Sequence, residues 1–594
     1  MKRFTLLSVA GAQKTIEVMD VIQGRSAGDL AIKDTTLLNV YSGEYLKPVS
    51  IVIKGEWIAY VGDDPGARIG PDTTVIPAKG RTVIPGLIDG HSHLANFEYN
   101  PAEFLRYTMK GGTTTIVTEI IEPFPIGGYE GLLDFLEALN DQPIKIFSTV
   151  PAMASTSKAA RGMPGQILKK LIQRDDILGL GEAYWSSVLQ EPGIFLSNFH
   201  DTLESGKKLE GHSSGARGTN LMAYIAPGIS SCHEPINKDE VLDRLRMGIH
   251  IMIREGSIRG DLEQIAPIKD DISDYRRLIL VTDGVGSKDL GQKGYMERVV
   301  QRAIDFGFEP IEAVKMATTN VADYFQLDGI IGGIAPGKYA DMVIIPEPTI
   351  IQAEWVISKG RVVAKDGAVL APPKKHVFSH DTLNSVHFDR RLQPSDFTIT
   401  CSGPGREIKV RVIDQVTGLV TRESVQSLSV SDGEIHSDVS RDVLKVAVID
   451  RNFSPGKKFV GLIRGHGLKN GAFACSSAWD VADIIVVGAD DADMATAVNR
   501  IYELQGGAVV CSGGEVVAEI PLPIFGLMSE LPMEVLVKQT DKLIEVLKEL
   551  GFPYNDPIRT ITVLTGAAIP FLRICEDGLV DIKTGETLSL FVES

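Results

Sequence analysis

Two histidines in the segment VIPGLIDGHSHL, residues 83–94, carry the strongest chemical signal in the chain. His91 and His93 are two residues apart, so on an extended backbone both side chains point the same way. They follow an apolar run of strand length, and imidazoles gathered at a strand end are natural ligands for a divalent transition metal. The alternative is a pair of surface histidines after a strand, but the surrounding PGxIDGHxH pattern favours ligands. The segment therefore predicts a metal site.

Eight apolar runs of strand length alternate with helix-length segments, which is the pattern of parallel βα units. Eight units in about 200 to 250 residues predict a (β/α)8 barrel, whose active site lies at the C-terminal ends of its strands. The helices expected between the strands include 102–109, 130–139 and 238–247. The predicted strands are Val83–Asp89, Thr114–Glu119, Ile144–Val150, Ile177–Glu182, Lys208–His212, Ile229–His233, His250–Arg254 and Leu278–Asp283.

The barrel is expected between two β-rich flanks and a third region. Short strands separated by Gly and Asp turns fill residues 28–84 and return at 338–370, which predicts a composite β-sandwich from 1–84 plus 328–371 beside a barrel of 85–327. Residues 372–395 are polar and rich in Pro and His, as in a linker or an active-site flap. Residues 396–594 mix strands and helices, which predicts a C-terminal α/β or α+β domain.

Composition excludes several classes of function. The chain has 594 residues and a formal net charge of −17, which argues against binding a long polyanion by counterion release. No basic and apolar leader resembles a signal peptide, and no apolar run is long enough to span a membrane. The five cysteines are scattered without a CxxC pair, which suits a reducing cytoplasm. We therefore expect a cytoplasmic protein with no nucleic-acid or membrane partner.

The histidine motif resembles that of the amidohydrolase superfamily, whose members take metal ligands from barrel strands 1, 4, 5, 6 and 8. The resemblance implies a ligand at the end of each matching predicted strand. Singly these residues could be helix caps, loop histidines or a turn former, but together they form a ligand set. The implied ligands beyond His91 and His93 are Glu182 in LGLGEAYW, His212 in EGHSSG, His233 in SSCHEP and Asp283 in LILVTDG.

Many relatives carry a carboxylated lysine at strand 4, whereas this chain has Glu182 there. A carboxylate can bridge two cations through its two oxygens. We therefore expect two divalent transition metals, one held by His91, His93 and Asp283 and the other by His212 and His233, with Glu182 as the bridge. Mixed imidazole and carboxylate ligands suit manganese or iron, with zinc as the alternative.

The resemblance narrows to the adenine deaminase family, and it covers nearly the whole chain. The barrel segments GTTTIVTEIIEP, EGHSSGARGTNLMAYIAPGISSCHE and IMIREGS are similar to that family. So are GLIRGHGLKNGAFACSSAWD, DIIVVGADDADMATAVNRI and IPLPIFGLMS in the C-terminal region. This implies hydrolysis of adenine to hypoxanthine and ammonia by a metal-activated hydroxide. It also implies a purine base as substrate and a homo-oligomer, with a dimer as the expected form.

The resemblance places Glu122 where the family has a proton-transfer glutamate, with Glu119 as its rival, and Asp283 would take the proton of the attacking water. Arg254 would orient the substrate or pair with a neighbouring acid. Polar family positions are occupied here by Ile121, by Gly284 and, in the run AWDVAD, by Trp479 and Ala482. If those positions contact the base, this protein would accept a different ring from the one that the family accepts. Trp479 could stack on a larger ring or wall it off.

These departures keep other functions open. One alternative is another amidohydrolase, namely an aminopurine or pterin deaminase or a cyclic-amide hydrolase. The other is a non-catalytic scaffold, which the intact set of six ligands opposes. A substrate panel separates the first alternative from adenine deamination, and a metal assay tests the second.

Overall fold

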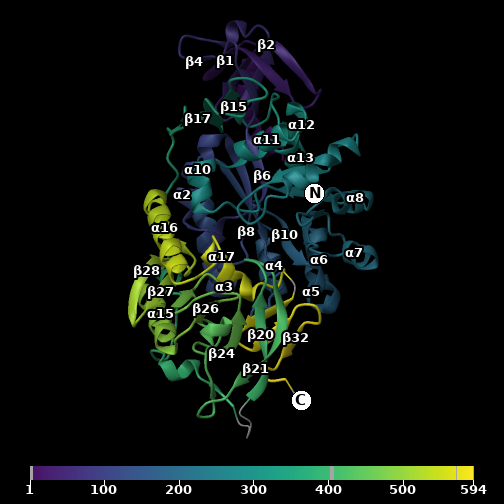
Figure 1. The fold of residues 1–594 in the computed structure, drawn as a ribbon. Helices are drawn as coiled ribbons and strands as arrows, with labels where there is room; N and C mark the ends of the chain where they lie inside the picture. Colours follow the sequence, from purple (N-terminus) through teal and green to yellow (C-terminus); the bar gives the residue numbers. More distant parts are fainter. Residues whose placement is uncertain (1–3, 402–406, 570, 593–594) are drawn as a thin grey trace.

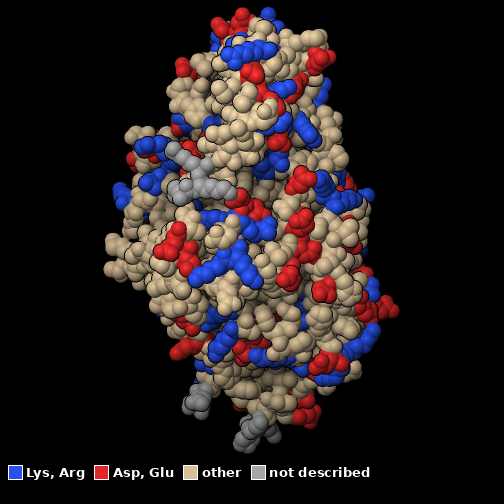
Figure 2. Space-filling model, turned by 180° about the vertical axis from the view of Figure 1, so that it is seen from behind, with Lys and Arg blue, Asp and Glu red and all other residues tan. Residues whose placement is uncertain are grey.

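The computed structural model describes residues 4–401, 407–569 and 571–592. Figure 1 shows three regions stacked along the molecule, with a β-rich sheet at one end, a barrel in the middle and a mixed α/β region at the other end. Within the described residues, no helix is both long and apolar enough to cross a membrane. Figure 2 shows acidic and basic side chains scattered together over the face opposite to that of Figure 1.

The central region is the expected barrel of parallel strands. Hydrogen bonds join five strands in the order β11-β10-β9-β8-β6 and three in the order β12-β13-β14. The two sheets meet at both edges, where the N–H of Ser230 donates to Leu209 at 2.9 Å and the N–H of Asp283 donates to His91 at 3.1 Å. The strands are β6 (Leu87–His93), β8 (Thr113–Glu119), β9 (Lys145–Val150), β10 (Ile177–Tyr184), β11 (Lys208–His212), β12 (Ser231–Cys232), β13 (His250–Arg254) and β14 (Leu278–Val281).

Helices connect and cover these strands. The three helices expected at 102–109, 130–139 and 238–247 are confirmed as α2 (Pro101–Thr108), α3 (Pro123–Leu139) and α8 (Lys238–Arg246). Asn100 and Asn237 begin α2 and α8 as N-caps, because their side chains accept the N–H of the third helical residue. The others are α4 (Gly165–Leu171), α5 (Trp185–Gln190), α6 (Pro192–Glu204), α7 (Gly218–Ile225), α9 (Leu262–Ile265), α10 (Ser287–Lys293), α11 (Met296–Asp305), α12 (Pro310–Met316) and α13 (Thr319–Phe325).

Both flanks of the barrel join one nine-stranded sheet. Its path is β18-β17-β16-β15-β5-β1-β2-β3, with β4 paired to β1. β5 and β15 pair antiparallel, so a strand that precedes the barrel lies beside one that follows it. The bounds are β1 (Leu30–Asn39), β2 (Glu44–Lys54), β3 (Trp57–Gly62), β4 (Thr74–Pro77), β5 (Thr82–Pro85), β15 (Met342–Ile345), β16 (Trp355–Ser358), β17 (Arg361–Lys365) and β18 (Ala368–Val369).

Two features near the N-terminus differ from expectation. The predicted strand Val83–Asp89 is divided, since its first residues lie in β5 and the rest in β6. Gly86 separates the two strands, and a Cβ there would stand 2.2 Å from the Thr114 hydroxyl, so the chain crosses from sheet to barrel where only glycine fits. Helix α1 (Leu6–Ile22) precedes the sheet and was not predicted.

The C-terminal region contains an eight-stranded sheet in the order β21-β20-β24-β23-β26-β25-β27-β28 and a small sheet in the order β30-β31-β32. Helices α15 (Asp491–Leu504) and α16 (Met533–Glu549) pack on the large sheet, and α17 (Pro557–Thr562) lies near the barrel. The strands are β20 (Glu407–Gln415), β21 (Thr421–Ser429), β23 (Val443–Asp450), β24 (Lys458–Arg464), β25 (Ala472–Cys475), β26 (Asp483–Gly488), β27 (Gly507–Ser512), β28 (Glu515–Pro521), β30 (Leu572–Cys575), β31 (Gly578–Asp581) and β32 (Glu586–Leu588).

The C-terminal region docks on the barrel through backbone and side-chain contacts. A short strand after β6, β7 (Glu98–Tyr99), pairs in parallel with β29 (Met528–Ser529). Glu103 of α2 accepts the N–H of Met533 at the start of α16, with a distance of 2.9 Å. The barrel loop after β9 adds the Ser155 hydroxyl, which donates to the backbone carbonyl of Asp480 at 2.7 Å. The predicted domain boundaries stay a prediction, but these contacts bring the C-terminal region over the ends of the barrel strands.

Candidate active site

The six predicted ligands lie at, or directly after, the C-terminal ends of five barrel strands. His91 and His93 are on β6, Glu182 on β10 and His212 at the end of β11, while His233 and Asp283 follow β12 and β14 within two residues. All six side chains belong to buried residues. The strand topology therefore brings together the residues that the sequence separates by up to 192 positions, from His91 to Asp283.

Asp89 fixes the relative position of the first and last strands. Its Oδ2 atom accepts hydrogen bonds from the hydroxyls of Thr282 and Tyr295, both at 2.6 Å, and its Oδ1 atom accepts the N–H of His91 at 3.2 Å. Asp283 itself adopts a left-handed backbone conformation with φ of 57°. Such a conformation is uncommon outside glycine, and Asp is among the residues that tolerate it. This network aims the Asp283 carboxylate at the histidines of β6.

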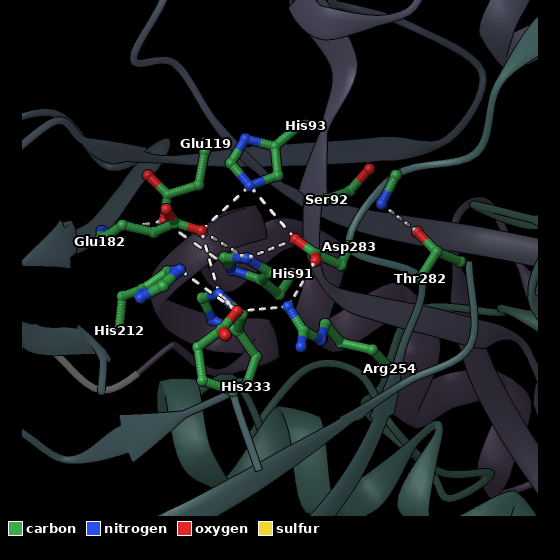
Figure 3. A network of polar contacts seen from close by, with 12 residues as sticks. His91, Ser92, His93, Glu119, Glu182, His212, His233, Arg254, Thr282 and Asp283 are labelled. Atoms are coloured by element: carbon green, nitrogen blue, oxygen red, sulfur yellow. Dashed lines mark hydrogen bonds and ion pairs between the residues drawn. The ribbon is translucent and has the colours of Figure 1, made fainter. Parts of the chain in front are cut away.

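The ligand atoms converge on the carboxylates of Glu182 and Asp283 (Figure 3). The Nε2 atoms of His91, His93 and His233 lie 3.1, 3.0 and 3.2 Å from Oε1 of Glu182. The Nε2 atoms of His91 and His93 also lie 3.4 and 3.3 Å from Oδ1 of Asp283. Ligand atoms of His91, Glu182, His233 and Asp283 are close enough to hold one metal ion. The expected partition placed His233 with His212 and the bridging Glu182, and here the ligand atoms of His233 also lie close to those of His91 and Asp283.

His212 belongs to a second cluster that includes Glu234, a residue that was not singled out from the sequence. His212 Nε2 lies 3.2 Å from Oε1 of Glu234, and His233 Nε2 lies 3.5 Å from the same oxygen. These three residues form another group able to hold a metal ion. Glu234 directly follows His233 in SSCHEP, so its adjacency to a ligand was the available signal.

Arg254, at the end of β13, pairs with neighbouring acids. Its guanidinium contacts Glu234 and lies 3.2 Å from Asp283 and 3.0 Å from Asp261. Burial alone would lower the pKa of Arg254, but the three carboxylates raise it above its ordinary value. The sequence left open whether Arg254 orients the substrate or pairs with a neighbouring acid. The pairing with acids is present, and Arg254 also lines the pocket described below.

Glu119 and Glu122, the two rivals for proton transfer, occupy different places. Glu119 lies beneath the ligands with its Oε1 atom 3.9 Å from Nδ1 of His91, and Glu210 of β11 approaches the same nitrogen at 3.8 Å. Glu122 is at the N-terminus of α3 and lines the pocket, where Asn96 donates a hydrogen bond to its Oε1 atom at 2.7 Å. Burial raises the pKa of Glu122 above its usual range.

A pocket of about 190 Å³ opens beside the ligands and is shared between barrel and C-terminal region. The barrel contributes His93, Glu182, Tyr184, His212, His233 and Asp283, while the C-terminal region contributes Thr417, Leu419, Val420, Trp479, Asp480, Ala568 and Ile569. Trp479 therefore forms part of the pocket wall, and its role toward a substrate stays a prediction. The pocket-lining residues that the structure describes include neither Ile121 nor Gly284.

Known proteins match this chain along nearly its whole length. Residues 193–370 match the amidohydrolase family, and residues 418–586 match the adenine deaminase C-terminal domain. An adenine deaminase of Clostridium botulinum (strain 657 / Type Ba4) is 34% identical over 586 residues, covering 96% of this chain and 97% of its own. This chain belongs to the adenine deaminase family. An adenine deaminase of Moorella thermoacetica is also 34% identical, over 583 residues, with the same shares covered.

Solved structures also resemble part of this adenine deaminase family member. A β-aspartyl dipeptidase of Fervidobacterium islandicum AW-1 is 19% identical with a TM-score of 0.47, covering 57% of this chain and 98% of its own. An N-acetylglucosamine-6-phosphate deacetylase of Pasteurella multocida is 16% identical with a TM-score of 0.46, covering 57% and 100%. The match to the amidohydrolase family implies use of a divalent metal, and the clusters around Glu182 and Glu234 are suited to holding one.

Proposed function

We propose that this adenine deaminase family member hydrolyses adenine to hypoxanthine and ammonia in the pocket beside Glu182 and Asp283. The observation that carries the proposal is that six ligand-type side chains lie together at the strand ends, five of them lining the pocket, in a chain similar over 96% of its length to adenine deaminases. Two divalent ions would be held by His91, His93, Glu182, His212, His233 and Asp283. We infer manganese or iron, with zinc as the alternative.

The donor set fits such ions chemically. Three imidazole nitrogens crowd the single Oε1 atom of Glu182 at 3.0 to 3.2 Å. One carboxylate oxygen has too few lone pairs for good hydrogen bonds to all three, whereas a cation among these atoms satisfies nitrogens and oxygens alike. When bound, a divalent ion lowers the pKa of water and supplies hydroxide at neutral pH.

The side chains of this chain would move the protons. Water adds to carbon 6 of the ring, and Asp283 accepts the proton that the water loses. Glu122 donates a proton to the adjacent ring nitrogen, and Asp283 passes its proton to the exocyclic amine, which leaves as ammonia. The hydroxyl on carbon 6 then returns a proton to Glu122 as the carbonyl of hypoxanthine forms. Because burial raises the pKa of Glu122, this carboxyl retains a proton more readily than a solvated glutamate does. Its Oε2 atom has no hydrogen-bond partner within the described residues, so it is available to a substrate.

The test replaces Glu122 by glutamine in the metal-loaded protein. Glu122→Gln should keep the metal content of the wild type and lower adenine turnover by about 10²–10⁴, the usual cost of removing a positioned acid or base. Glu130→Gln, at an exposed glutamate of the same helix α3 outside the pocket, serves as the control and should leave turnover unchanged. Full activity of Glu122→Gln would contradict the assigned role.

A panel of substrates separates the alternatives. Trp479 in the pocket wall is the observation that favours a larger ring, so pterins, other aminopurines and cyclic amides are compared with adenine by ammonia or product release. We expect adenine to be the best substrate. Turnover of a cyclic amide with none of any aminopurine would contradict deamination.

The dimer and the cytoplasmic location expected from the sequence stay predictions. Light scattering of the purified protein tests the dimer.

A further inference from the structure

The C-terminal region places one carboxyl group inside the barrel pocket. Asp480 lies in the loop after β25, adopts a left-handed conformation with φ of 65°, and lines the pocket together with Glu122 and Glu182. Its exposed fraction is 3%. The mechanism described above does not use this residue, although it is the acid that the C-terminal region contributes to the described pocket wall.

Asp480 is held rigidly by contacts from both regions. The Tyr184 hydroxyl, at the end of β10, donates to Oδ1 of Asp480 at 2.8 Å. The N–H of Ala567 donates to Oδ2 at 2.8 Å, and the Ser155 hydroxyl donates to the backbone carbonyl of Asp480 at 2.7 Å. Each carboxylate oxygen thus has one neutral donor and keeps capacity for a second. The carboxylate is fixed in place before any ligand arrives, as a substrate-binding group should be.

A purely structural role explains this residue less well. The donors from Tyr184 and Ala567 are neutral, and the nearby carboxylates of Glu122 and Glu182 repel an ionised Asp480. Burial, with that repulsion, raises the pKa of Asp480 to about 7. Joining barrel and C-terminal region could be achieved by a neutral side chain without this cost. A ligand that donates an N–H to the carboxylate would offset the cost, because hydrogen bonds to ionised groups are stronger than those between neutral groups.

We propose that Asp480 contacts the substrate and accepts a hydrogen bond from the ring N–H of the imidazole part of a purine base. This rests on the proposed function, in which the opposite part of the purine, with carbon 6 and the adjacent nitrogen, faces Asp283 and Glu122. A free base carries one N–H on its imidazole ring, whereas a nucleoside carries a sugar at nitrogen 9. The C-terminal region would therefore select free bases over nucleosides through Asp480.

The experiment compares adenine with 9-methyladenine and 7-methyladenine, both of which lack the single imidazole N–H because a methyl group has replaced its hydrogen. Metal-loaded wild type, Asp480→Ala and Asp480→Asn are assayed for kcat and KM, with metal content as a control. We expect Asp480→Ala to lower kcat/KM for adenine by about 10- to 100-fold, mainly through KM, since the lost contact is made in both ground and transition states. For the two methylated bases, which cannot donate to Asp480, the same substitution should change kcat/KM by less than about threefold, because there is no hydrogen bond to lose.

Tyr184→Phe is the matched control, because it removes a donor to Asp480 but leaves the carboxylate in the pocket. It should preserve the preference for adenine over the methylated bases. If Asp480→Ala lowers kcat/KM equally for all three bases, Asp480 is structural and the proposal is overturned. If Asp480→Ala does not fold, Asp480→Asn is compared instead, since it keeps the volume but leaves only a weaker neutral acceptor. It should lower kcat/KM for adenine by less than alanine does and leave kcat/KM for the methylated bases nearly unchanged. Absence of adenine turnover in the wild type would instead overturn the proposed function, so the two failures are distinguishable.

Discussion

Two glutamates three residues apart have unrelated surroundings. Glu122 faces the pocket, while Glu119 lies under the ring of His91, where its carboxylate and that of Glu210 both approach Nδ1 of the imidazole. Carboxylates behind a ligating histidine commonly fix the orientation of the ring and raise its basicity. Glu119 is therefore suited to support the ligand rather than to exchange protons with substrate.

This difference gives a prediction about metal affinity. Glu119→Gln should weaken metal binding by about 10- to 100-fold, because an amide supports the ring of His91 less well than a carboxyl group does. The measurement is metal content after dialysis against a graded chelator, with Glu122→Gln as the comparison that keeps its metals. If Glu119→Gln binds metal as tightly as wild type but has no turnover at saturating metal, the roles of the two glutamates are reversed.

The sequence could predict residues whose signal is local. His91 and His93 carry theirs in a short motif, and the other four ligands follow apolar runs of strand length. Asp480 had no such signal, since its surroundings are created only when the loop after β25 docks on Tyr184 and Ser155. The role of Glu234 likewise depends on Arg254 from a different strand. Sequence patterns show strand ends, but they do not show which distant loops cover them.

Among the strands, the position of β6 matters most to the site, because β6 carries two of the proposed ligands, His91 and His93. Its link to β14 is the hydrogen-bond network of Asp89 with Thr282 and Tyr295. A buried carboxylate that loses one partner is left with unsatisfied hydrogen-bonding capacity, which costs about 1–3 kcal/mol. The alignment of β6 with Asp283 should therefore be sensitive to this single interaction.

Thr282→Val tests the link between the two strands. We expect the free energy of unfolding to fall by about 1–3 kcal/mol and the metal content to fall with it. Thr318→Val is the control, since the Thr318 hydroxyl is also buried but donates to Val314, a carbonyl of the preceding helix α12, away from the ligands. Denaturant titration and elemental analysis provide the two readouts. Unchanged metal content in Thr282→Val would mean that the ligands are aligned without Asp89.

The elements themselves were largely predictable because the barrel repeats one simple pattern. Each of the eight apolar runs contains or overlaps a barrel strand, and three expected helices are present. The predicted start of the first barrel strand was wrong. The residues of β5 and the first residues of β6 are both apolar, and only the crowding at Gly86 separates the two strands. Helix α1 precedes the first strand, so the pattern of alternating strands and helices gave no indication of it.

The pocket depends on docking of the C-terminal region onto the barrel. Helix α16 begins against α2, where Glu103 accepts the N–H of Met533 and Arg106 contacts Glu534 at 2.8 Å. Glu103 acts as a helix cap supplied by another part of the chain, and removal of a cap costs about 0.5–2 kcal/mol. Because the C-terminal region forms one wall of the pocket, weaker docking should reach the substrate.

Glu103→Ala should lower the temperature of thermal unfolding and raise KM for adenine with little change in metal content. The control is Glu130→Ala, since Glu130 is an exposed glutamate of another barrel helix, α3. Limited proteolysis should cleave Glu103→Ala faster than the control in the region 372–395. Equal melting temperatures and equal KM in the two variants would show that α2 and α16 do not hold the pocket closed.

The pairing of β5 with β15 has a consequence for biosynthesis. Because β5 is made before the barrel and β15 after it, the ribosome must deliver all eight barrel strands before β5 meets its antiparallel neighbour. At about 5–20 residues per second, this interval is on the order of tens of seconds. During that time an apolar edge, from Thr82 to Pro85, stays without its final partner on a nascent chain. We therefore expect the yield of folded protein to depend more on chaperones that shield such edges than on the free energy of unfolding of the finished protein.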